Sequence, residues 1–501
     1  MPSEALFLGM HVDTHGVGLI LLDKTGQERG SLQRAYTACG EAQCDPQDWW
    51  RAVRTGVKEL LRRTRSQVAH IRAVGVSGPA DIAVLMDKDQ QVLTPASFAC
   101  DASQHAALDE LHRMAGIRNL ANLCGSTGHP GSLASRMLVF REQERRAWHD
   151  LAHVLGAKDF LVMRLTGKAS TDPSSASRSN LYNPRTGHWS KQLLDRLNFD
   201  AAWLPEVLPG NQICGRVSPV AAQEVGLQTG TLVVAGADTL TAAAIACAAI
   251  EPGDTVITLG DEGPMLQVTA EAVRDAQHVL QTSGHCLAQL MALRADAVAS
   301  EVSLDWMTDV VASGMRQQAR RARCSVIDLL AESAAEAPPG SDGLLFIAPH
   351  GEQRGAFIGL RPEHHQAHMI RAVFEQSALA VARTVARLDA LTKPQRRRVL
   401  VQGSGAATTL WCQILSDAMD HELEACTDTH LSARGVAILA ASAVGLYKTI
   451  PKACTTMACR GQVFKPRRAA VAAYRGVRPD PQEAAALLAQ LDARSLSFTD
   501  S

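Results

Sequence analysis

The first eighty residues alternate between apolar strands and one amphipathic helix. Residues 5–12 and 16–23 are apolar runs joined by a short loop that contains glycine, and a polar turn at 24–27 leads into another extended segment. Residues 49–65 then carry apolar side chains at helical spacing, and 71–79 read as a buried strand that runs into a loop. The pattern predicts a three-strand meander, a helix and a further strand, an arrangement that opens many α/β domains.

The second half of the chain repeats this order. Residues 251–268 have the pattern of a hairpin, and residues 371–391 have helical spacing. Residues 396–405 read as a strand that ends in a Gly-rich loop, and 410–419 read as the helix that follows it. The chain therefore looks like two copies of one α/β plan.

Chain length supports the same division. A chain of 501 residues exceeds the usual limit for a single hydrophobic core. We therefore expect an α/β protein with two domains, residues 1–248 and 249–501, and a cleft between them. Hydrophobic residues make up 46% of the sequence and charged residues 20%, which is the balance of a globular protein that folds without a partner.

Net charge, apolar runs and cysteines indicate which partners and which cellular compartment to expect. The net charge of -1 gives no general attraction to nucleic acid or to an anionic membrane, so we expect neither as a partner. The N-terminus lacks the pattern of a signal peptide and no apolar run is long enough to cross a bilayer, which predicts a cytoplasmic protein. The twelve cysteines lack CxxC spacing, so we expect buried or free thiols in a reducing compartment.

One stretch, residues 233–264, has the layout of a phosphate-handling site. It reads VVAGADTLTAAAIACAAIEPGDTVITLGDEGP, which predicts a strand, a tight turn, a helix of small residues and a strand hairpin. Its turns nevertheless carry Asp238, Asp261 and Glu262. Carboxylates therefore stand where a phosphate group would be expected.

Taken together, the segments resemble the FGGY carbohydrate kinases, and among them the xylulokinase-like branch of the actin-like superfamily. The resemblance spans most of the chain and is carried by FLGMHVDTHGVGLILLDKTG, IRAVGVSGPADIAVLMDKD, KDFLVMRLTGKASTDPSSAS, VVAGADTL, GLLFIAPHGEQRGAFIGL, RAVFEQSA, VQGSGA and SARGVAILAA. It implies a two-domain actin-like, ribonuclease-H-like ATPase fold whose interdomain cleft takes ATP and a sugar. In such kinases an Asp takes the proton of the sugar hydroxyl, and Mg²⁺ with backbone amides stabilises the transferring phosphoryl group.

The first phosphate hairpin departs from the family pattern. The family reads roughly Gly-Ile-Asp-x-Gly-Thr, whereas residues 9–16 read GMHVDTHG. His11 then stands where the metal-linked Asp is found, Asp13 stands where a Gly lets phosphate approach, and Thr14 is kept. Because His11 and Asp13 alternate onto one strand face, they are a candidate replacement metal site, and the alternative is a His that is merely packed.

The second phosphate hairpin is altered as well. It ends Gly-Thr-Ser-Gly in the family and GDEG here, so Gly260 and Gly263 remain while Asp261 and Glu262 replace the hydroxyls. Like charges about 4 Å apart cost roughly 4 kcal/mol at an effective dielectric near 20, enough to weaken nucleotide binding severely. The carboxylates either point to solvent or recruit divalent cations such as Mg²⁺.

The catalytic stretch of the family, Gly-x-Gly-Asp-Asn, allows two registers. An ungapped register from 233 to 254 puts Thr239 at the catalytic position and Asp238 one residue early. One residue of helical rotation moves a side chain by about 100°, so Asp238 serves as the base only if the turn is shortened and the helix absorbs a residue. The alternative is that Asp238 caps the following helix, and one residue can do both.

The sugar-binding segments keep carboxylates but lose most other contacts. The family's Trp-Asn-Asp-x-Arg loop corresponds to ACDAS, which keeps Asp101 but has Ala99 for Trp and Ser103 for Arg. The Gln-Met-His-Gly stretch corresponds to PADI, with Asp81 in place of His. Asp81 and Asp101 are candidate ligands for hydroxyl groups of a sugar or polyol, and the alternative for each is a solvated loop carboxylate.

The segment that corresponds to the family's nucleotide-binding loop is closer to the family pattern than the phosphate and sugar segments are. VQGSGAATTLWCQILSDAM resembles the Gly-rich loop and helix beside the adenosine, where Gly403 and Gly405 let the backbone approach the nucleotide. The alternative is a turn that only packs a strand against a helix. The small residues of SARGVAILAA, among them Gly435, predict close helix packing behind the site.

Two functions follow from this pattern. The first is ATP-dependent phosphorylation of a ketose or polyol hydroxyl, with Asp238 as the base and with ATP and Mg²⁺ both in question because of the acidic hairpins. The second is a catalytically impaired relative that binds a sugar, a nucleotide or a protein partner without turnover. A homodimer is compatible with either function.

Overall fold

The computed structural model describes residues 5–36, 43–98, 100–260, 263–295, 301–349, 355–393 and 398–476. The chain divides into two compact units. The first comprises Met1–Asp254, Leu266–Arg294 and Asp428–Cys459, and the second comprises Thr255–Met265, Ala295–Thr427 and Arg460–Ser501. The bounds of these units differ from the predicted domains 1–248 and 249–501, and that division stays a prediction.

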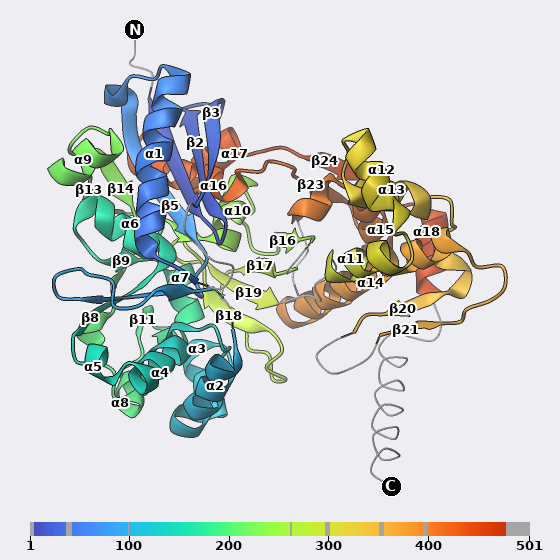
Figure 1. Ribbon diagram of the computed structural model, residues 1–501, viewed down its shortest axis with the longest axis horizontal. Coiled ribbons are helices and arrows are strands. Elements are labelled where there is room, and N and C mark those ends of the chain that lie inside the picture. Colours follow the sequence, from blue (N-terminus) through green and yellow to red (C-terminus); the bar gives the residue numbers. More distant parts are fainter. Residues whose placement is uncertain are drawn as a thin grey trace. The chain divides into compact units, whose positions relative to one another are not determined.

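The first unit is built on a mixed sheet with the strand order β13-β14-β5-β1-β2-β3, and β15 also pairs with β5 (Figure 1). Its strands are β1 (Leu6–Val12), β2 (Gly16–Asp23), β3 (Glu28–Ala35), β5 (Ile71–Gly78), β13 (Ile213–Arg216), β14 (Leu232–Val234) and β15 (Ala237–Asp238). The first three strands are antiparallel neighbours, whereas β5 runs parallel to β1. The predicted meander, helix and strand are therefore confirmed.

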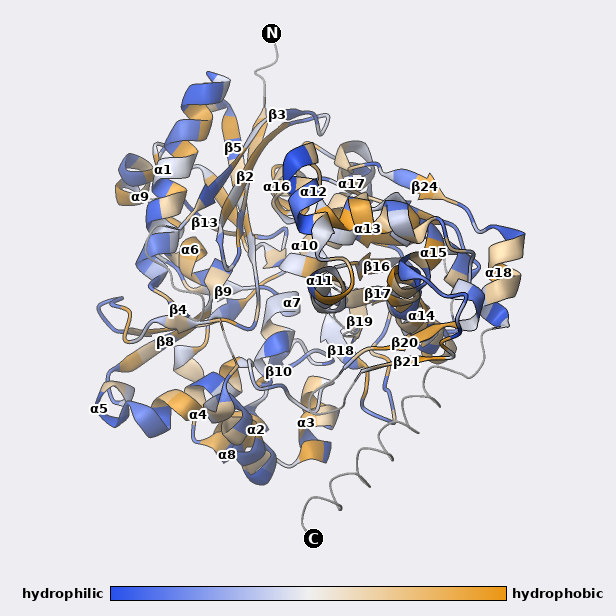
Figure 2. Ribbon diagram, turned by 45° about the vertical axis from the view of Figure 1, so that its right-hand side comes forward, coloured by the Kyte–Doolittle hydropathy of each residue, from blue (hydrophilic) through white to orange (hydrophobic). Residues whose placement is uncertain are grey.

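Helices cover both faces of this sheet, which explains why β1 and β2 are apolar almost throughout. Leu8 lies in one apolar cluster with Val53 of α1 (Pro46–Thr64), and Phe7 lies in another with Val436 of α16 (Leu431–Ala443). Figure 2 shows the hydrophobic colour along β2 and β5. The sheet therefore lies between two apolar layers, and a third apolar cluster of the unit includes Leu111, Met137 and Leu193.

Glycines bring α16 close to the sheet and to α10 (Thr239–Ala246). A Cβ atom on Gly9 would lie 1.9 Å from the carbonyl oxygen of Ala433, and one on Gly435 would lie 1.8 Å from that of Ala242. No side chain fits at such distances, so the backbones touch directly. These contacts place residues 428–459 in the first unit, and the predicted close packing of SARGVAILAA is observed.

We expect Gly435→Ala to destabilise the protein by about 1–3 kcal/mol, because the added methyl group meets backbone that must shift. The measurement is the midpoint of urea unfolding. Gly314→Ala is the matched control, since a Cβ atom there meets nothing within 4 Å. Equal midpoints for the two variants would show that the packing of α16 on α10 is looser than described.

The remaining helices and strands of the first unit surround this core. They are β4 (Gln43–Cys44), β6 (Ala83–Asp87), β7 (Ala96–Ser97), α2 (Ala102–Ala115), α3 (Ile117–Cys124), α4 (Leu133–Gln143), α5 (Arg145–Trp148), β8 (Leu151–Gly156), α6 (Ala157–Thr166), β9 (Ser170–Thr171), α7 (Pro173–Ala176), β10 (Tyr182–Asn183), β11 (His188–Trp189), α8 (Lys191–Leu197), β12 (Glu206–Val207), α9 (Pro219–Val225), β18 (Gln281–Gly284) and α17 (Ile450–Met457). The strands β17 (Met265–Thr269) and β19 (Met291–Ala295) begin or end at a unit boundary.

The second unit combines parallel strands with a long helix. Strand β22 lies between β16 and β23 and is parallel to both. The elements are β16 (Thr255–Thr258), α11 (Glu301–Val310), α12 (Gly314–Ala322), α13 (Val326–Ala334), β20 (Leu345–Ile347), β21 (Ala356–Ile358), α14 (Gln366–Thr392), β22 (Val399–Gln402), α15 (Thr409–Met419), β23 (Leu423–Ala425), β24 (Gln462–Phe464) and α18 (Arg468–Arg475). The predicted order of strand, helix, strand and helix is confirmed by β16, α14, β22 and α15.

Two further expectations from the sequence can be compared with this structure. No helix in the described part of the chain is both long enough and apolar enough to span a membrane. Cys44 forms a disulfide, contrary to the prediction of free thiols, while the other described cysteines form none. The absence of CxxC spacing does not exclude a disulfide, because two cysteines only need backbone geometry that brings them together.

Candidate functional site

Asp238 lies where β15 ends and α10 begins. Strand β15 is parallel to β5 and pairs Asp238 with Gly78. The Oδ1 atom of Asp238 accepts a hydrogen bond of 2.8 Å from the backbone N–H of Thr241, so Asp238 is the N-cap of α10. Its own backbone N–H donates to Ser174 Oγ at 3.1 Å. The capping role considered for Asp238 is thus observed, and its role as base stays a prediction.

A buried arginine neutralises Asp238. Nη2 of Arg294 on β19 forms an ion pair with Asp238 Oδ2 and donates to Thr241 Oγ1 at 2.8 Å, and Nε donates to Ser283 Oγ at 3.0 Å. Burial alone would raise the pKa of Asp238, but the Arg294 guanidinium and the N–H of Thr241 outweigh it and hold that pKa below its usual range. Asp238 is therefore ionised at neutral pH and is a weak proton acceptor.

A second buried charge network is linked to Asp238 through Ser174. Nζ of Lys158 lies 2.6 Å from Asp159 Oδ1, 3.0 Å from Asp172 Oδ1 and 3.0 Å from the carbonyl oxygen of Ala235. Asp172 in turn accepts hydrogen bonds from the backbone N–H and the hydroxyl of Ser174, whose Oγ accepts the N–H of Asp238. The network fixes the end of β15 and thereby the position of the Asp238 backbone.

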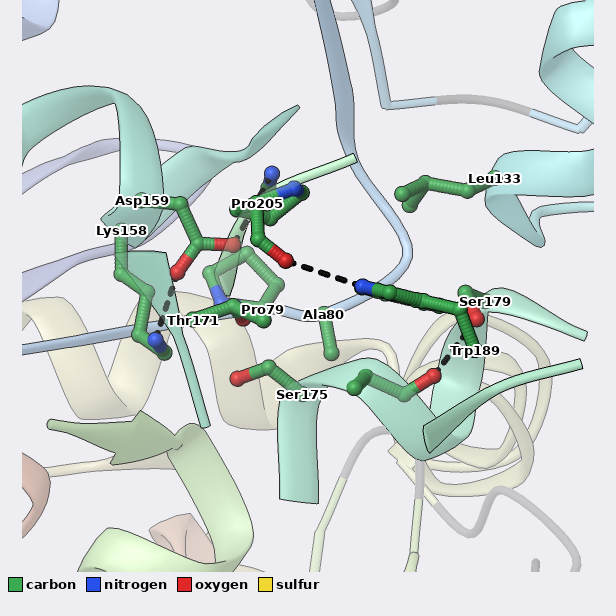
Figure 3. Close-up of a pocket in the computed structure, with 12 residues that line it drawn as sticks. Pro79, Ala80, Leu133, Lys158, Asp159, Thr171, Ser175, Ser179, Trp189 and Pro205 are labelled. Carbon is green, nitrogen blue, oxygen red and sulfur yellow. Dashed lines mark hydrogen bonds and ion pairs between the residues drawn. The ribbon is translucent and has the colours of Figure 1, made fainter. Parts of the chain in front are cut away.

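Part of this network lines a small cavity (Figure 3). Lys158 and Asp159 lie on one side of it, and Trp189 lies on another with its Nε1 atom donating to the carbonyl oxygen of Pro205. The cavity measures about 10 Å³, which is room for a single water molecule. It is too small to hold a sugar.

The two candidate sugar-binding residues make local contacts, Asp101 through its carboxylate and Asp81 through its backbone carbonyl group. Asp101 is the N-cap of α2, where its side chain accepts from Ser103 N–H at 2.7 Å and Gln104 completes a capping box. The carbonyl oxygen of Asp81 accepts from Nε of the buried Arg136 at 2.8 Å. Ala99 lies outside the described residues. Substrate contacts of Asp81 and Asp101 stay predictions.

The first phosphate hairpin uses its carboxylate to hold its own turn. Asp13 Oδ1 accepts hydrogen bonds of 2.7 Å from the N–H groups of both His15 and Gly16, while no partner of Oδ2 lies among the described residues. Thr14 is exposed and its Oγ1 lies 2.9 Å from His15 Nδ1. The carboxylate therefore keeps one oxygen for a ligand.

His11 and Asp13 both line a cavity of about 210 Å³ beside this hairpin; the other lining residues are Gly18, Gln33, Thr429 and His430. His11 Nδ1 lies 3.1 Å from Ser77 Oγ, and burial lowers the pKa of His11, so the ring is uncharged at neutral pH. Within the described ranges, no group of three or more His, Cys, Asp or Glu side chains is arranged to hold a metal ion. The two-residue metal site stays a prediction.

In the second unit, the second hairpin and the Gly-rich loop pack against each other. The hairpin closes through a 2.9 Å bond from Thr258 N–H to the carbonyl oxygen of Pro264, with φ of 144° at Gly260 and 54° at Gly263. Gly405 N–H donates to the carbonyl oxygen of Leu259 at 2.9 Å. Asp261 and Glu262 lie outside the described residues.

Gly403 is required by this packing. Its φ is 90°, which favours glycine, and a Cβ atom there would lie 2.6 Å from the carbonyl oxygen of Leu259. The packing role considered for Gly403 and Gly405 is therefore observed. A nucleotide contact stays a prediction for Thr14, Gly260, Gly263, Gly403 and Gly405.

Comparison with known protein families decides the identity of the chain. The N-terminal domain of the FGGY family of carbohydrate kinases matches residues 6–246, and the C-terminal domain of the same family matches residues 256–444. The chain belongs to the FGGY family of carbohydrate kinases. The resemblance seen in the sequence is therefore confirmed, and the protein is an FGGY carbohydrate kinase by sequence and by fold.

Individual relatives agree with this assignment. The xylulose kinase of Escherichia coli K12 is 25% identical over 437 residues, which is 84% of this chain and 86% of that protein. A xylulose kinase of Staphylococcus epidermidis is 23% identical over 92% of this chain and 93% of its own length. The crystal structure of xylulose kinase from Rhodospirillum rubrum has a TM-score of 0.86 at 24% identity and covers 97% of this chain and 99% of that chain. The predicted two-domain actin-like fold is confirmed.

Sequence reasoning did not find three buried residues of this FGGY kinase, Arg294, Lys158 and His285. Arg294 lies in the apolar strand β19, Lys158 lies in an apolar segment at the start of α6, and His285 follows β18. A charged residue inside an apolar element predicts a buried partner, because an isolated charge is not stable there. That signal was present for Arg294 and Lys158, but it does not name the partner.

Proposed function

We propose that this FGGY kinase transfers a phosphoryl group from ATP to a hydroxyl group of a ketose or polyol. The proposal rests on the match of both family domains, together with the position of Asp238 at the end of β15 inside a buried polar cluster. Asp238 would orient the hydroxyl and accept its proton as the phosphoryl group arrives. Because positioning dominates phosphoryl transfer, a weak base in a fixed place still contributes.

Mg²⁺ fits the first hairpin through Asp13. Mg²⁺ bound with a nucleotide commonly uses one or two protein carboxylates together with phosphate oxygens and waters. Asp13 offers Oδ2, while its Oδ1 is held by the turn. The ion would neutralise phosphate charge, and Asp13 would hold it beside the hairpin.

We expect this arrangement to give Asp13→Asn opposite effects with and without Mg²⁺. The amide keeps an oxygen for the turn and removes the negative charge, so ATP should bind more tightly than to the wild type when Mg²⁺ is absent. When Mg²⁺ is present, the variant should bind about tenfold more weakly, which corresponds to roughly 1.4 kcal/mol. Titration calorimetry with ATP, with Mg²⁺ or with EDTA, measures both values.

Asp89→Asn is the matched control, since Asp89 is exposed and the substitution removes the same charge outside the hairpin. If Asp13→Asn changes ATP affinity equally in the two conditions, Asp13 is not the Mg²⁺ ligand. Transfer itself is tested by mass spectrometry of ketoses and polyols incubated with ATP and the full chain. Failure to detect any phosphorylated product across the screen would exclude the proposed activity.

One observation favours a second function. The ion pair of Asp238 with Arg294 lowers the basicity of the residue that we propose as the base. A binding protein without turnover would show saturable binding of a sugar or nucleotide in calorimetry and no product in the mass spectra. The same two measurements therefore separate the kinase from the impaired relative.

A further inference from the structure

Two arginines contribute to one face of the β18–β19 hairpin. The hairpin pairs Gln281 directly with Arg294, and Arg294 Nε donates to Ser283 Oγ, so residues 281, 283 and 294 share that face. Nη1 of Arg178 donates to Gln281 Oε1 at 2.8 Å. Arg178 and Arg294 therefore both lie beside Gln281, and Arg294 also contacts Asp238.

The charges on this face do not balance. Arg294 is paired with Asp238, whereas Arg178 has no carboxylate within ion-pair distance among the residues that the structure describes. Arg178 is also only half-buried, so a ligand can reach it. The face thus carries two cations and a single anion, which leaves one positive charge for a partner of opposite sign.

Two hydrogen-bond donors at this cluster, Arg294 Nη1 and His285 Nε2, have no acceptor among the described residues. Nη1 of Arg294 has no partner among the described residues, because the hydrogen bonds of this side chain use Nε and Nη2. His285 is 1% exposed and its Nδ1 accepts the backbone N–H of Leu287 at 3.1 Å, so the neutral ring carries its hydrogen on Nε2. That Nε2 atom is buried without a partner.

Asp238 and Arg294 both act electrostatically on His285, which puts its ring at the same cluster. Burial lowers the pKa of His285 to about 4, so the ring is neutral at pH 7 and Nε2 is a donor there. Asp238 already accepts from the N–H of Thr241 through Oδ1 and from Arg294 and the Thr241 hydroxyl through Oδ2. An acceptor-only group with a negative charge therefore fits the open positions best.

We propose that Arg178, Arg294 and His285 bind an anionic oxygen group of the substrate, a carboxylate or a phosphate, beside Asp238. The inference rests on the proposed sugar kinase function and makes the substrate a sugar acid or a sugar phosphate instead of a neutral sugar. Binding of the anionic end would then hold the hydroxyl that receives the phosphoryl group at a fixed distance from Asp238.

Titration calorimetry of the full chain with three matched compounds tests this assignment. Xylitol, D-xylonate and xylitol 5-phosphate share five carbons and differ in one terminal group. At least one of the two anions should bind about tenfold or more tightly than xylitol, because charge-assisted hydrogen bonds are the stronger ones. The tighter of the two anions identifies carboxylate or phosphate as the source of the charge.

Variants of Arg178 make the test specific to the site. Arg178→Gln should abolish the preference for the anion, and Arg178→Lys should restore part of it, since it returns the charge without the planar fork. Arg185→Gln is the matched control, because Arg185 is exposed and donates to the carbonyl oxygen of Asn122. Xylitol binding as tightly as both anions, or an anion preference that survives in Arg178→Gln, would overturn the proposal.

The outcome can be separated from that of the proposed function. If D-xylonate or xylitol 5-phosphate binds with the expected preference but neither these compounds nor any other in the screen yields a product with ATP, the anion site stands and the kinase proposal fails. If ATP phosphorylates a neutral sugar and neither anion is preferred, the kinase proposal stands and the anion site fails.

Discussion

Replacing Asp238 with asparagine should lower kcat for phosphoryl transfer by about 10²–10⁴-fold, with little change in the Kd for ATP. An amide cannot accept the proton of the substrate hydroxyl, and loss of a positioned base costs about this much. Asparagine keeps an oxygen for the N–H of Thr241, so the cap of α10 remains. Initial rates with a saturating sugar, together with calorimetry for ATP, measure the two quantities.

Arg294 makes a control necessary, because Asp238→Asn leaves a buried guanidinium without its carboxylate. Breaking a buried ion pair destabilises a protein strongly, whereas removing both partners costs much less. The double variant Asp238→Asn with Arg294→Met should therefore regain stability but not activity. Recovery of turnover in the double variant would show that the single variant failed through misfolding and that Asp238 is not the base.

The same ion pair has a consequence for acid stability. The carboxyl group of Asp238 has a lowered pKa in the folded protein. The stability that it contributes is therefore present above the ordinary Asp value near pH 4 and is lost as the pH falls through the lower folded-state pKa. A buried carboxylate of this kind stabilises the protein at neutral pH, where the kinase assay is made.

Lys158→Met should reduce the free energy of unfolding by about 3–5 kcal/mol, the largest stability effect that we expect from a single substitution. The side chain is 1% exposed and lies between Asp159 and Asp172, so its loss leaves two buried carboxylates without a cation. Urea unfolding followed by circular dichroism measures the change in free energy.

Lys191→Met is the matched control for this experiment. Lys191 also pairs with an aspartate, Asp195, but its side chain is 85% exposed, and such surface pairs contribute about 0–1 kcal/mol. Adding Asp172→Asn to Lys158→Met should recover part of the loss, because the two residues interact directly. A loss below about 1 kcal/mol in Lys158→Met would mean that water or a conformational shift compensates the two carboxylates.

Local patterns predicted the elements of the fold well. The strands β1 and β2 are apolar on both faces because helices cover both faces of the sheet. Helix α1 has apolar side chains along one face and polar side chains on the rest of its surface. The hairpin carboxylate Asp13 shows the limit of such reasoning. The sequence placed it against phosphate, whereas its Oδ1 caps the two N–H groups of its own turn. Side-chain direction in a short turn depends on hydrogen bonds that a residue pattern does not reveal.

Long-range partners could not be predicted. The sequence predicted Asp238 at the start of a helix and left open whether it caps the helix or acts as a base. It did not predict the ion pair with Arg294, which lies 56 positions further along the chain. Likewise, the division at 248 and 249 could not include residues 428–459 in the first unit, since that placement follows from contacts such as Gly435 with Ala242. Pairings of this kind depend on topology, which periodicity along the chain does not encode.

The placement of α16 has a consequence for the order of folding during synthesis. The sheet of the first unit is complete in sequence by Asp238, but the helix that covers one of its faces begins only at Leu431. A nascent chain therefore exposes the apolar face around Phe7 while almost two hundred further residues are translated. Exposed apolar surface of this kind invites aggregation and chaperone binding, so the first unit of this kinase matures after the ribosome has nearly finished.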